Sequence, residues 1–195
     1  MYEPREDSFL LQKHIKKYAR GFVLDIGTGS GILALEAAKS KKTTKIFAVD
    51  IDQEAIDYCS KNIDNKKIIF LVSDLFSFFK KLKSINEDML LKKHNLKIGK
   101  EIKFDTILFN PPYLPGNKYP DLESPKGYEL IQRFFKDAKE FLKPKGKILI
   151  VFSSLTNKPK INQIIEKNRF RFKELEKQHI SFEDIYVYLV TNNKI

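Results

Sequence analysis

An apolar run followed at once by three closely spaced glycines constrains this chain more than any other feature. Residues 22–26 have the composition of a buried β-strand, and Gly27, Gly29 and Gly31 follow directly. Apolar residues then recur at helical spacing over 32–38. A strand, a glycine-rich turn and a helix form the first unit of nucleotide-binding α/β folds, whose glycines let the backbone turn sharply and a ligand come close. The sequence predicts such a unit, the alternative being an ordinary glycine-rich βα turn.

The next strand pattern ends on an acid at a distance typical of a ribose-binding carboxylate. Residues 45–50 form this pattern, and Asp50 lies 23 positions after Gly27. In nucleotide-binding α/β folds, an acid in this place accepts hydrogen bonds from ribose hydroxyls. The glycines follow a G-x-G-x-G pattern, which lacks the spacing for a pyrophosphate, and no P-loop lysine follows them. The pattern therefore indicates a nucleoside cofactor without a pyrophosphate, such as S-adenosylmethionine.

Two further acids follow strand ends on the same predicted edge. Asp52 has the position of an N-cap for a helix over 53–62. Asp74 follows a third strand pattern, residues 68–72. We expect Asp74 to accept a hydrogen bond from the adenine amino group, because strand ends collect ligand groups. The alternative is that Asp74 caps the next helix.

A fourth strand pattern, residues 104–109, ends at Asn110-Pro111-Pro112-Tyr113. Pro111 has no N–H and a fixed φ, so the strand must stop there and leave Asn110 at its carboxyl end. The side-chain carbonyl of Asn110 and the backbone carbonyl of Pro111 can accept both N–H bonds of a planar amino group, and Tyr113 can stack on that group. The tetrapeptide therefore predicts a site for a carboxamide or a base amine, or else a proline-rich turn.

The remaining patterns complete an α/β fold. Strands are expected over 148–152, 170–175 and 185–190, and helices over 9–18, 128–142 and 160–168. No helix-length segment separates the last two strands, so they should pair antiparallel. We expect a Rossmann-like fold: a mostly parallel seven-stranded sheet with an antiparallel C-terminal strand and helices on both faces.

The charge of the chain permits a nucleic-acid partner. The formal net charge is +11 and the pI is near 9.5. The 36 basic residues are 31 lysines and five arginines spread over the whole chain, a balance that also suits a solvated surface, since arginine is preferred for phosphate recognition. Residues 77–103 form a lysine-rich insert, which we expect to hold a peripheral helix and a mobile loop. It is either a solvated face or an RNA-binding arm.

Cysteine and histidine usage excludes several classes of site. Cys59 is the only cysteine, which excludes an internal disulfide, and His14, His94 and His179 are scattered without metal-ligand spacing. No metal site is expected. No apolar run reaches the length of a membrane span, and the first residues lack a signal-peptide pattern. We expect one cytosolic domain over residues 1–195 with no membrane contact.

Together these motifs resemble the class I S-adenosylmethionine-dependent methyltransferases. Residues 23–31 are similar to the family's first motif, Asp50 to its ribose-binding acid and Asp74 to its adenine-side acid. The tetrapeptide is similar to the motif of members that methylate amino groups, which makes Asn110, Pro111 and Tyr113 the implied catalytic residues. The cofactor contacts implied by the resemblance are Ser8, Asp25, Gly27, Thr28, Gly29, Gly31, Asp50, Ile51, Asp74, Leu75 and Asn110.

The opening segment, residues 2–11, resembles that of the short archaeal and eukaryotic HemK-like protein N5-glutamine methyltransferases. The resemblance implies that the substrate is the glutamine in the Gly-Gly-Gln loop of a class 1 translation release factor, and that a small zinc-binding activator protein is a partner. It also implies that residues 1–20 cover the cofactor, with Ser8 holding its amino-acid end. An acidic lead-in that only caps the first helix is the alternative for this segment.

Two other functions stay open at this point. The same motifs fit N-methylation of a base in RNA or DNA, such as adenine N6. A catalytically silent RNA- or protein-binding module is the third possibility, although a scaffold needs none of Gly27, Gly29, Asp50 and Asn110 at strand ends.

Overall fold

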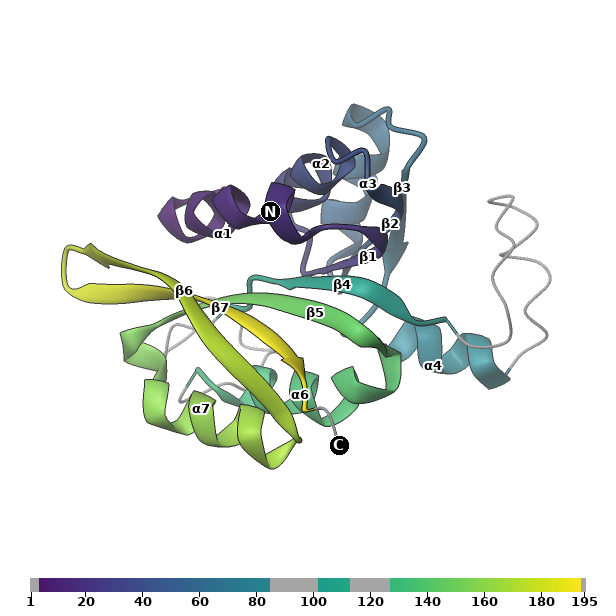
Figure 1. Ribbon diagram of the computed structural model, residues 1–195. Coiled ribbons are helices and arrows are strands. Elements are labelled where there is room, and N and C mark those ends of the chain that lie inside the picture. The colour runs from purple at the N-terminus through teal and green to yellow at the C-terminus, as the bar shows by residue number, and fades with distance from the viewer. Residues whose placement is uncertain (1–3, 85–101, 113–126, 194–195) are drawn as a thin grey trace.

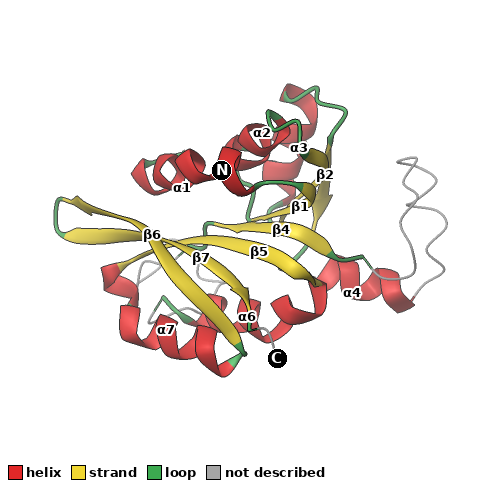
Figure 2. Cartoon of the chain, viewed as in Figure 1, coloured by secondary structure: helices red, strands yellow, loops and turns green. Residues whose placement is uncertain are grey.

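A seven-stranded sheet with helices on both faces forms the body of the protein (Figures 1 and 2). The computed structural model describes residues 4–84, 102–112 and 127–193. The strands are β1 (Gly21–Ile26), β2 (Thr43–Asp50), β3 (Ile68–Val72), β4 (Phe104–Phe109), β5 (Leu142–Ser153), β6 (Phe170–Ile180) and β7 (Glu183–Asn192). The helices are α1 (Glu6–Tyr18), α2 (Ile32–Ala38), α3 (Gln53–Asn62), α4 (Ser77–Ser84), α6 (Glu129–Phe141) and α7 (Lys158–Lys167), with a short 3₁₀ helix η1 (Ser154–Thr156).

The strand order is β3-β2-β1-β4-β5-β7-β6. The pairs among β1 to β5 are parallel, whereas β7 is antiparallel to both of its neighbours. In Figure 1, α1, α2 and α3 lie on one face of the sheet, and α4, α6 and α7 lie on the other. This arrangement confirms the predicted mostly parallel sheet with an antiparallel C-terminal strand.

The register of the central strands brings three predicted site residues into one row. Ile26 of β1 is paired with Val49 of β2 and with Phe109 of β4. The next residue along each chain is Gly27, Asp50 or Asn110, respectively. The carboxyl ends of parallel strands meet at one edge of a sheet, so these three residues lie side by side.

A phenylalanine-rich layer fixes β4 beneath Asn110. Phe109, the last residue of β4, stacks on Phe134 of α6 with ring centroids 4.4 Å apart. Phe76 stacks on Phe141 at 4.8 Å, and all four rings are at most 1% exposed. Aromatic pairs at such distances add to the hydrophobic stabilisation of a core, so the strand that carries Asn110 is anchored from the α6 side.

Several element bounds differ from the sequence-based expectation, each for a local reason. Helix α1 begins at Glu6 rather than at residue 9, because Asp7 and Ser8 are buried in its first turn. Helix α6 ends at Phe141, since the buried Leu142 already pairs with Phe104 of β4. Strands β6 and β7 are longer than the apolar runs that predicted them, because the outer part of their hairpin is largely polar and projects beyond the sheet (Figure 1).

Strands β1, β3 and β4 and helix α3 follow the prediction closely, whereas β5 begins at Leu142, six residues before the expected start at 148, because Leu142 pairs with Phe104 of β4. Cys59 is a buried free thiol. Of the lysine-rich insert, the structure describes α4, while residues 85–101 lie outside the described part. Among the described helices, none combines the length and the apolar character that a membrane span requires.

Candidate active site

The glycine-rich turn connects β1 to α2 and lies against the end of β4. Gly27 has a φ of +69°, and its amide donates a 2.8 Å hydrogen bond to the Val49 carbonyl of β2. A Cβ built on Gly27 would lie 3.8 Å from the backbone oxygen of Asn110. The left-handed backbone favours glycine here. Because glycine has no side chain, none stands between the carboxyl ends of β1 and β4.

Local packing requires a glycine at position 31. It is the N-cap of α2, with a φ of +80°. An added Cβ would lie 2.6 Å from Cδ1 of Ile63 and 3.3 Å from Sγ of Cys59. The predicted cofactor role of Gly31 stays a prediction, and the structure adds a steric reason for the glycine.

Asp50 joins the glycine turn to the end of β2. Its Oδ2 accepts a 2.9 Å hydrogen bond from the Gly29 amide, and its Oδ1 accepts a 3.0 Å bond from the Asp52 amide. Asp52 accepts in turn from the Glu54 amide at 2.9 Å and caps α3, as the sequence predicts. A carboxylate has about four acceptor positions, so Asp50 keeps capacity for further donors.

Asp25 is a buried acid next to Asp50. Its side chain is fully buried, Oδ2 accepts a 2.7 Å bond from the Thr28 hydroxyl, and Oδ1 has no hydrogen-bond partner among the described residues. Burial raises the pKa of Asp25 to about 7, with a further rise from the negative charge of Asp50, while the Thr28 bond lowers it. The turn therefore holds an acid that titrates near neutral pH and has one unused acceptor.

The side-chain amide of Asn110 is held from the first turn of α1. Its Nδ2 donates to Oγ of Ser8 at 3.0 Å and to Oδ2 of Asp7 at 3.3 Å. The Asp7 carboxylate also accepts from the backbone amide of Ser8 at 2.6 Å and from the Ser8 hydroxyl at 3.3 Å. The Asp7 carboxylate accepts hydrogen bonds here, and the Ser8 hydroxyl donates its own proton to Asp7. The oxygens of both side chains therefore face Asn110 as acceptors, so the amide must present its Nδ2 group to them, which fixes its orientation.

This orientation leaves the Asn110 carbonyl oxygen without a partner. Oδ1 is buried and accepts no hydrogen bond from any described residue. A buried acceptor without a partner is unfavourable by about 1–3 kcal/mol. An N–H donor from a bound molecule would remove this penalty, so the arrangement can hold an amino group at the end of β4.

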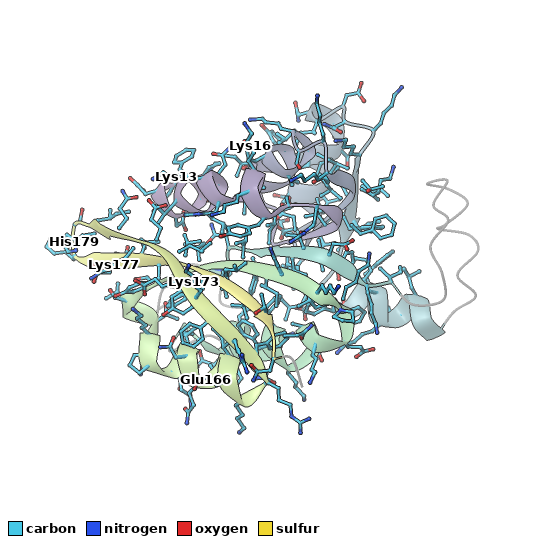
Figure 3. All side chains as sticks on the ribbon, in the orientation of Figure 1. Lys13, Lys16, Glu166, Lys173, Lys177 and His179 are labelled. Carbon is cyan, nitrogen blue, oxygen red and sulfur yellow. The ribbon has the colours of Figure 1, made fainter. Side chains whose placement is uncertain are left out.

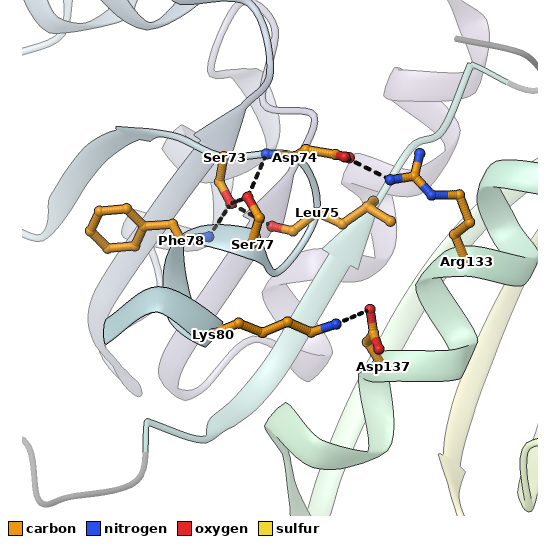
Figure 4. Close-up of polar contacts among 8 residues, drawn as sticks. All are labelled: Ser73, Asp74, Leu75, Ser77, Phe78, Lys80, Arg133 and Asp137. Carbon is orange, nitrogen blue, oxygen red and sulfur yellow. Dashed lines mark hydrogen bonds and ion pairs between the residues drawn. The ribbon is translucent and has the colours of Figure 1, made fainter. Parts of the chain in front are cut away.

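Figure 4 shows the polar contacts at the end of β3. Asp74 forms an ion pair with Arg133 of α6, with Nη2 and Oδ2 2.6 Å apart, and its backbone amide donates to Oγ of Ser77 at 3.1 Å. The Ser73 hydroxyl donates to the carbonyl of Leu75 at 2.8 Å and holds Leu75 at a φ of +48°. The carboxylate of Asp74 therefore points to α6, and its predicted contact with adenine stays a prediction.

The other predicted residues surround this edge. Ile51 follows Asp50 and is 53% exposed, an apolar side chain open to a ligand, whereas Leu75 is 7% exposed. Pro111 is buried, and Tyr113 lies outside the described residues. No cluster of metal-ligating side chains occurs in the three described stretches.

Asp7 is the site residue that the sequence analysis missed. It was part of a lead-in assigned either to a cap or to a cofactor cover, yet Arg5, not Asp7, is the N-cap residue, and it makes no side-chain capping bond. Asp7 is 5% exposed and Ser8 3% exposed. The sequence does place an acid and a serine directly before the first apolar positions of α1. Because the apolar face of this helix packs on the sheet, polar residues next to that face become buried as well.

The comparisons with known proteins agree with this geometry. Residues 6–180 match the family model described as the methyltransferase small domain. A protein of Methanocaldococcus jannaschii, provisionally named a protein N5-glutamine methyltransferase, is 31% identical over 96% of this chain and 89% of its own length. A release factor glutamine methyltransferase of Rhodopirellula baltica is 32% identical over 68% of this chain, which spans only 45% of that protein.

Among solved structures, the E. cuniculi Mtq2–Trm112 complex, described as responsible for methylation of the eRF1 termination factor, has a chain similar in fold. Its TM-score is 0.69 with 21% identity, and the alignment covers 98% of both chains. The predicted S-adenosylmethionine-dependent methyltransferase is thus confirmed, and the chain belongs to the methyltransferase small domain family.

Proposed function

We propose that the protein transfers a methyl group from S-adenosylmethionine to the side-chain amide nitrogen of the glutamine in the Gly-Gly-Gln loop of a class 1 translation release factor. The observation that carries the proposal is the buried, unpartnered Oδ1 of Asn110 beside the glycine turn. A glutamine amide presents two N–H donors in one plane. The names of relatives in M. jannaschii and R. baltica support this substrate.

The residues around the glycine turn fit the cofactor. Asp50 retains acceptor capacity for ribose hydroxyls, and the buried Oδ1 of Asp25, which has no hydrogen-bond partner among the described residues, offers a further acceptor beside it. Gly27 leaves room at the junction of β1 and β4, and Ile51 offers an exposed apolar surface. S-adenosylmethionine, when bound here, supplies an electrophilic methyl group.

Asn110 would then act by positioning and by electrostatics. A carboxamide nitrogen is a weak nucleophile, because its lone pair is delocalised into the carbonyl. The Asn110 Oδ1 and the Pro111 carbonyl each accept one N–H bond, hold the nitrogen in place and stabilise the positive charge that grows on it. The role predicted for Tyr113 is to stack on the plane of the amide. After methyl transfer the nitrogen releases one proton to water. Ser8 and Asp7 position Asn110 by holding its Nδ2.

A small zinc-binding activator protein is the proposed partner. The structural relative Mtq2 was solved as a complex with Trm112. The present chain would show higher methylation activity when such a protein is supplied, and co-purification of the pair tests the association.

Transfer of label from the methyl group of S-adenosylmethionine tests the proposed substrate. The protein is incubated with purified release factor or with total RNA, each with and without the activator. Label in the release factor, and none after its Gly-Gly-Gln glutamine is changed to alanine, is the expected result. Label in RNA alone would instead support base methylation, the alternative that the net charge of +11 permits.

A further inference from the structure

A shallow pocket of positive side chains lies far from the candidate active site. The pocket has a volume of about 270 Å³ and lies where α6 and α7 end and β6 begins. Its lining residues are Phe135, Lys136, Lys139, Lys167, Asn168 and Arg169. We call the four basic members, Lys136, Lys139, Lys167 and Arg169, the cationic pocket. No acid lines it.

Carboxylates do not neutralise these four cations within the described part of the chain. The ion pairs of the neighbouring elements involve other residues, such as Lys80 with Asp137 and Arg133 with Asp74. All four basic side chains are exposed. Like charges that are gathered without ion pairs to carboxylates repel each other, so a bound anion would stabilise the cluster.

The sequence of β6 explains why its basic side chains, Arg171 and Lys173, reach solvent. Aromatic and basic residues alternate after Arg169, and the aromatic ones anchor the strand: Phe170 contacts Phe135 at 5.6 Å, and Phe172 stacks on Tyr188 at 4.9 Å. Arg169 has a φ of +64°, and its amide donates to the Glu166 carbonyl at 2.8 Å. The turn thus fixes Arg169 at the mouth of the pocket.

A second group of cations lies on the other face of the sheet, around Tyr18 of α1. The ammonium groups of Lys147 and Lys17 lie 5.1 Å and 5.3 Å from the centre of the Tyr18 ring. Burial lowers the pKa of Lys147, and the positive charges of Arg20 and Lys17 lower it further. We call Lys17, Arg20 and Lys147 the Tyr18 cluster.

Strand β6 connects the two groups. Arg171 and Lys147 both pair with Thr191 of β7, so their side chains project from the same face of the sheet. Lys173, labelled in Figure 3, follows on β6 and is exposed. Three of the chain's five arginines, Arg20, Arg169 and Arg171, therefore lie in this region, and arginine is the preferred residue for phosphate contacts.

We propose that the cationic pocket and the Tyr18 cluster bind the phosphate backbone of RNA. A series of cations across both faces of one sheet edge suits a polymer with a negative charge on every nucleotide better than a single anion. These cations lie at the opposite edge of the sheet from Asn110. RNA would thus be a binding partner and not the methyl acceptor.

The separation of the two regions supports independent roles. Lys147 pairs with Thr106, and Asn110 lies four residues further along the β4 chain. At about 3.3 Å per residue, this is on the order of 13 Å along the strand. The RNA site should therefore leave methyl transfer from the opposite edge unaffected.

Fluorescence anisotropy with a fluorescein-labelled single-stranded RNA of about 20 nucleotides tests the proposal, the length being chosen so that several phosphates can be contacted. The test variant carries Lys136→Gln, Lys139→Gln, Lys167→Gln and Arg169→Gln. The control carries Lys41→Gln, Lys42→Gln, Lys61→Gln and Lys66→Gln, which removes the same charge from exposed positions near β2 and β3. The strand order places β3 and β6 at opposite ends of the sheet.

We expect the test variant to bind RNA at least tenfold more weakly than the control does. The slope of log K, the association constant for RNA, against log salt concentration should also be flatter by about 3, because each of four lost phosphate contacts on a single strand contributes about 0.7. Circular dichroism checks folding, and the double variant Lys136→Gln/Lys139→Gln, changed only on the exposed face of α6, should show part of the effect. Equal weakening in test variant and control would overturn the proposal. So would competition by poly-L-glutamate as strong as that by unlabelled RNA, or by millimolar inorganic phosphate alone.

Methylation of the release factor is measured in the same variants. Activity equal to that of the unmodified protein is expected, because the substituted residues lie away from Asn110. Methyl label entering the RNA would overturn this proposal, whereas failure to methylate the release factor with RNA binding intact would contradict only the proposed function.

Discussion

The side chain of Asn110 has two polar ends, and only one of them has a partner among the described residues. Nδ2 donates to Ser8 and Asp7, while the buried Oδ1 accepts nothing from the described residues. We expect Asn110→Ala to lower kcat about 10²- to 10³-fold, the effect of removing one preorganised electrostatic contact. Affinity for S-adenosylmethionine should change little. Single-turnover kinetics and calorimetry measure the two quantities, and normal turnover in the variant would exclude the mechanism.

Ser8 provides a matched test of positioning. Ser8→Ala removes one of the two acceptors for Asn110 Nδ2 and leaves the unpartnered Oδ1 in place. We expect kcat to fall by less than in Asn110→Ala, about tenfold, as the amide gains freedom. Ser8→Thr, which keeps the hydroxyl, should restore part of the rate. If kcat fell in both Ser8 variants but did not change in Asn110→Ala, the important group would be the Ser8 side chain itself.

Asp25 should make the stability of the protein depend on pH. Burial raises its folded-state pKa to about 7, above the unfolded value of 3.8. The folded protein therefore holds a proton that the unfolded chain releases, and stability falls as pH rises from about 4 to about 7. Three pKa units correspond to roughly 4 kcal/mol as an upper limit.

Urea unfolding between pH 4 and pH 8 measures this effect. In Asp25→Asn the side chain cannot ionise, so the decline over that interval should largely disappear. A variant with the same pH dependence as the unmodified protein would show that another group is responsible.

At the residue scale the sequence predicted the strand-end residues and missed their local partners. Asp50, Asp52 and Asn110 each follow a strand at a position that a short pattern defines. The contact of Asp7 with Asn110 joins residues 103 positions apart, and the ion pair of Asp74 with Arg133 spans 59 positions. Such contacts depend on how helices pack on the sheet, which local patterns do not specify.

At the element scale, a β-bulge in β6 determines how α1 is held. The register shifts between Glu174 and Glu176, so these two acids point to opposite faces of the sheet although they are two residues apart. Glu174 pairs with Lys158 of α7 at 2.7 Å, and Glu176 contacts Lys13 at 3.1 Å and His14 at 2.7 Å on α1. In Figure 3, Lys13 on α1 and Lys177 on β6 mark the two elements that this contact joins.

Glu176→Gln should therefore loosen α1. Burial alone would raise the pKa of Glu176, yet the hydrogen bonds from Lys13 and His14 hold it below its usual value, so the ion pairs contribute above the unfolded pKa and are lost as pH falls through the folded one. The Glu176 side chain is 31% exposed, so we expect a loss of only about 0.5–1 kcal/mol. Faster amide hydrogen exchange in α1 is the measurement, with Glu174→Gln as the control that leaves α1 unchanged.

In the turn between β1 and α2, Gly27 and Gly31 are needed for different reasons. Gly31→Ala places a Cβ against Ile63 and should destabilise the fold by about 1–3 kcal/mol. Gly27→Ala meets only an ordinary contact at 3.8 Å, so it should destabilise the fold less and weaken cofactor binding more. Thermal unfolding and calorimetry on both variants test the division, and equal effects on stability would contradict it.

The sequence predicts well the bounds of strands that coincide with strong apolar runs. It does not predict the bounds of strands whose length depends on pairing with a neighbouring strand. Strands β3 and β4 have the predicted bounds, since both are apolar and end at polar or proline residues. The outer halves of β6 and β7 are exposed on a projecting hairpin, so polar residues such as Lys177, Gln178 and His179 give no apolar alternation. The bulge between Glu174 and Glu176 has no local signal either.

At the scale of the whole molecule, the parallel direction of the central strands separates two kinds of surface. The carboxyl edge of the sheet carries Asp25, Asp50 and Asn110, and the other edge carries the cationic pocket and the Tyr18 cluster. The sequence predicted the fold class and the edge of the sheet at which Asp50 and Asn110 meet, because one strand, turn and helix unit fixes the direction of a parallel sheet. It did not predict where the positive charge gathers, because the lysines are spread along the chain and only the fold brings them together.

The central claim is that Asn110 holds a glutamine side-chain amide for methylation. Tandem mass spectrometry of a class 1 release factor, incubated with the protein, S-adenosylmethionine and the activator, tests it directly. We expect a single added methyl group on the side-chain nitrogen of the Gly-Gly-Gln glutamine, and none when Asn110→Ala replaces the unmodified protein. A methyl group on another residue, or the same modification with the variant, would show that Asn110 does not hold the glutamine amide.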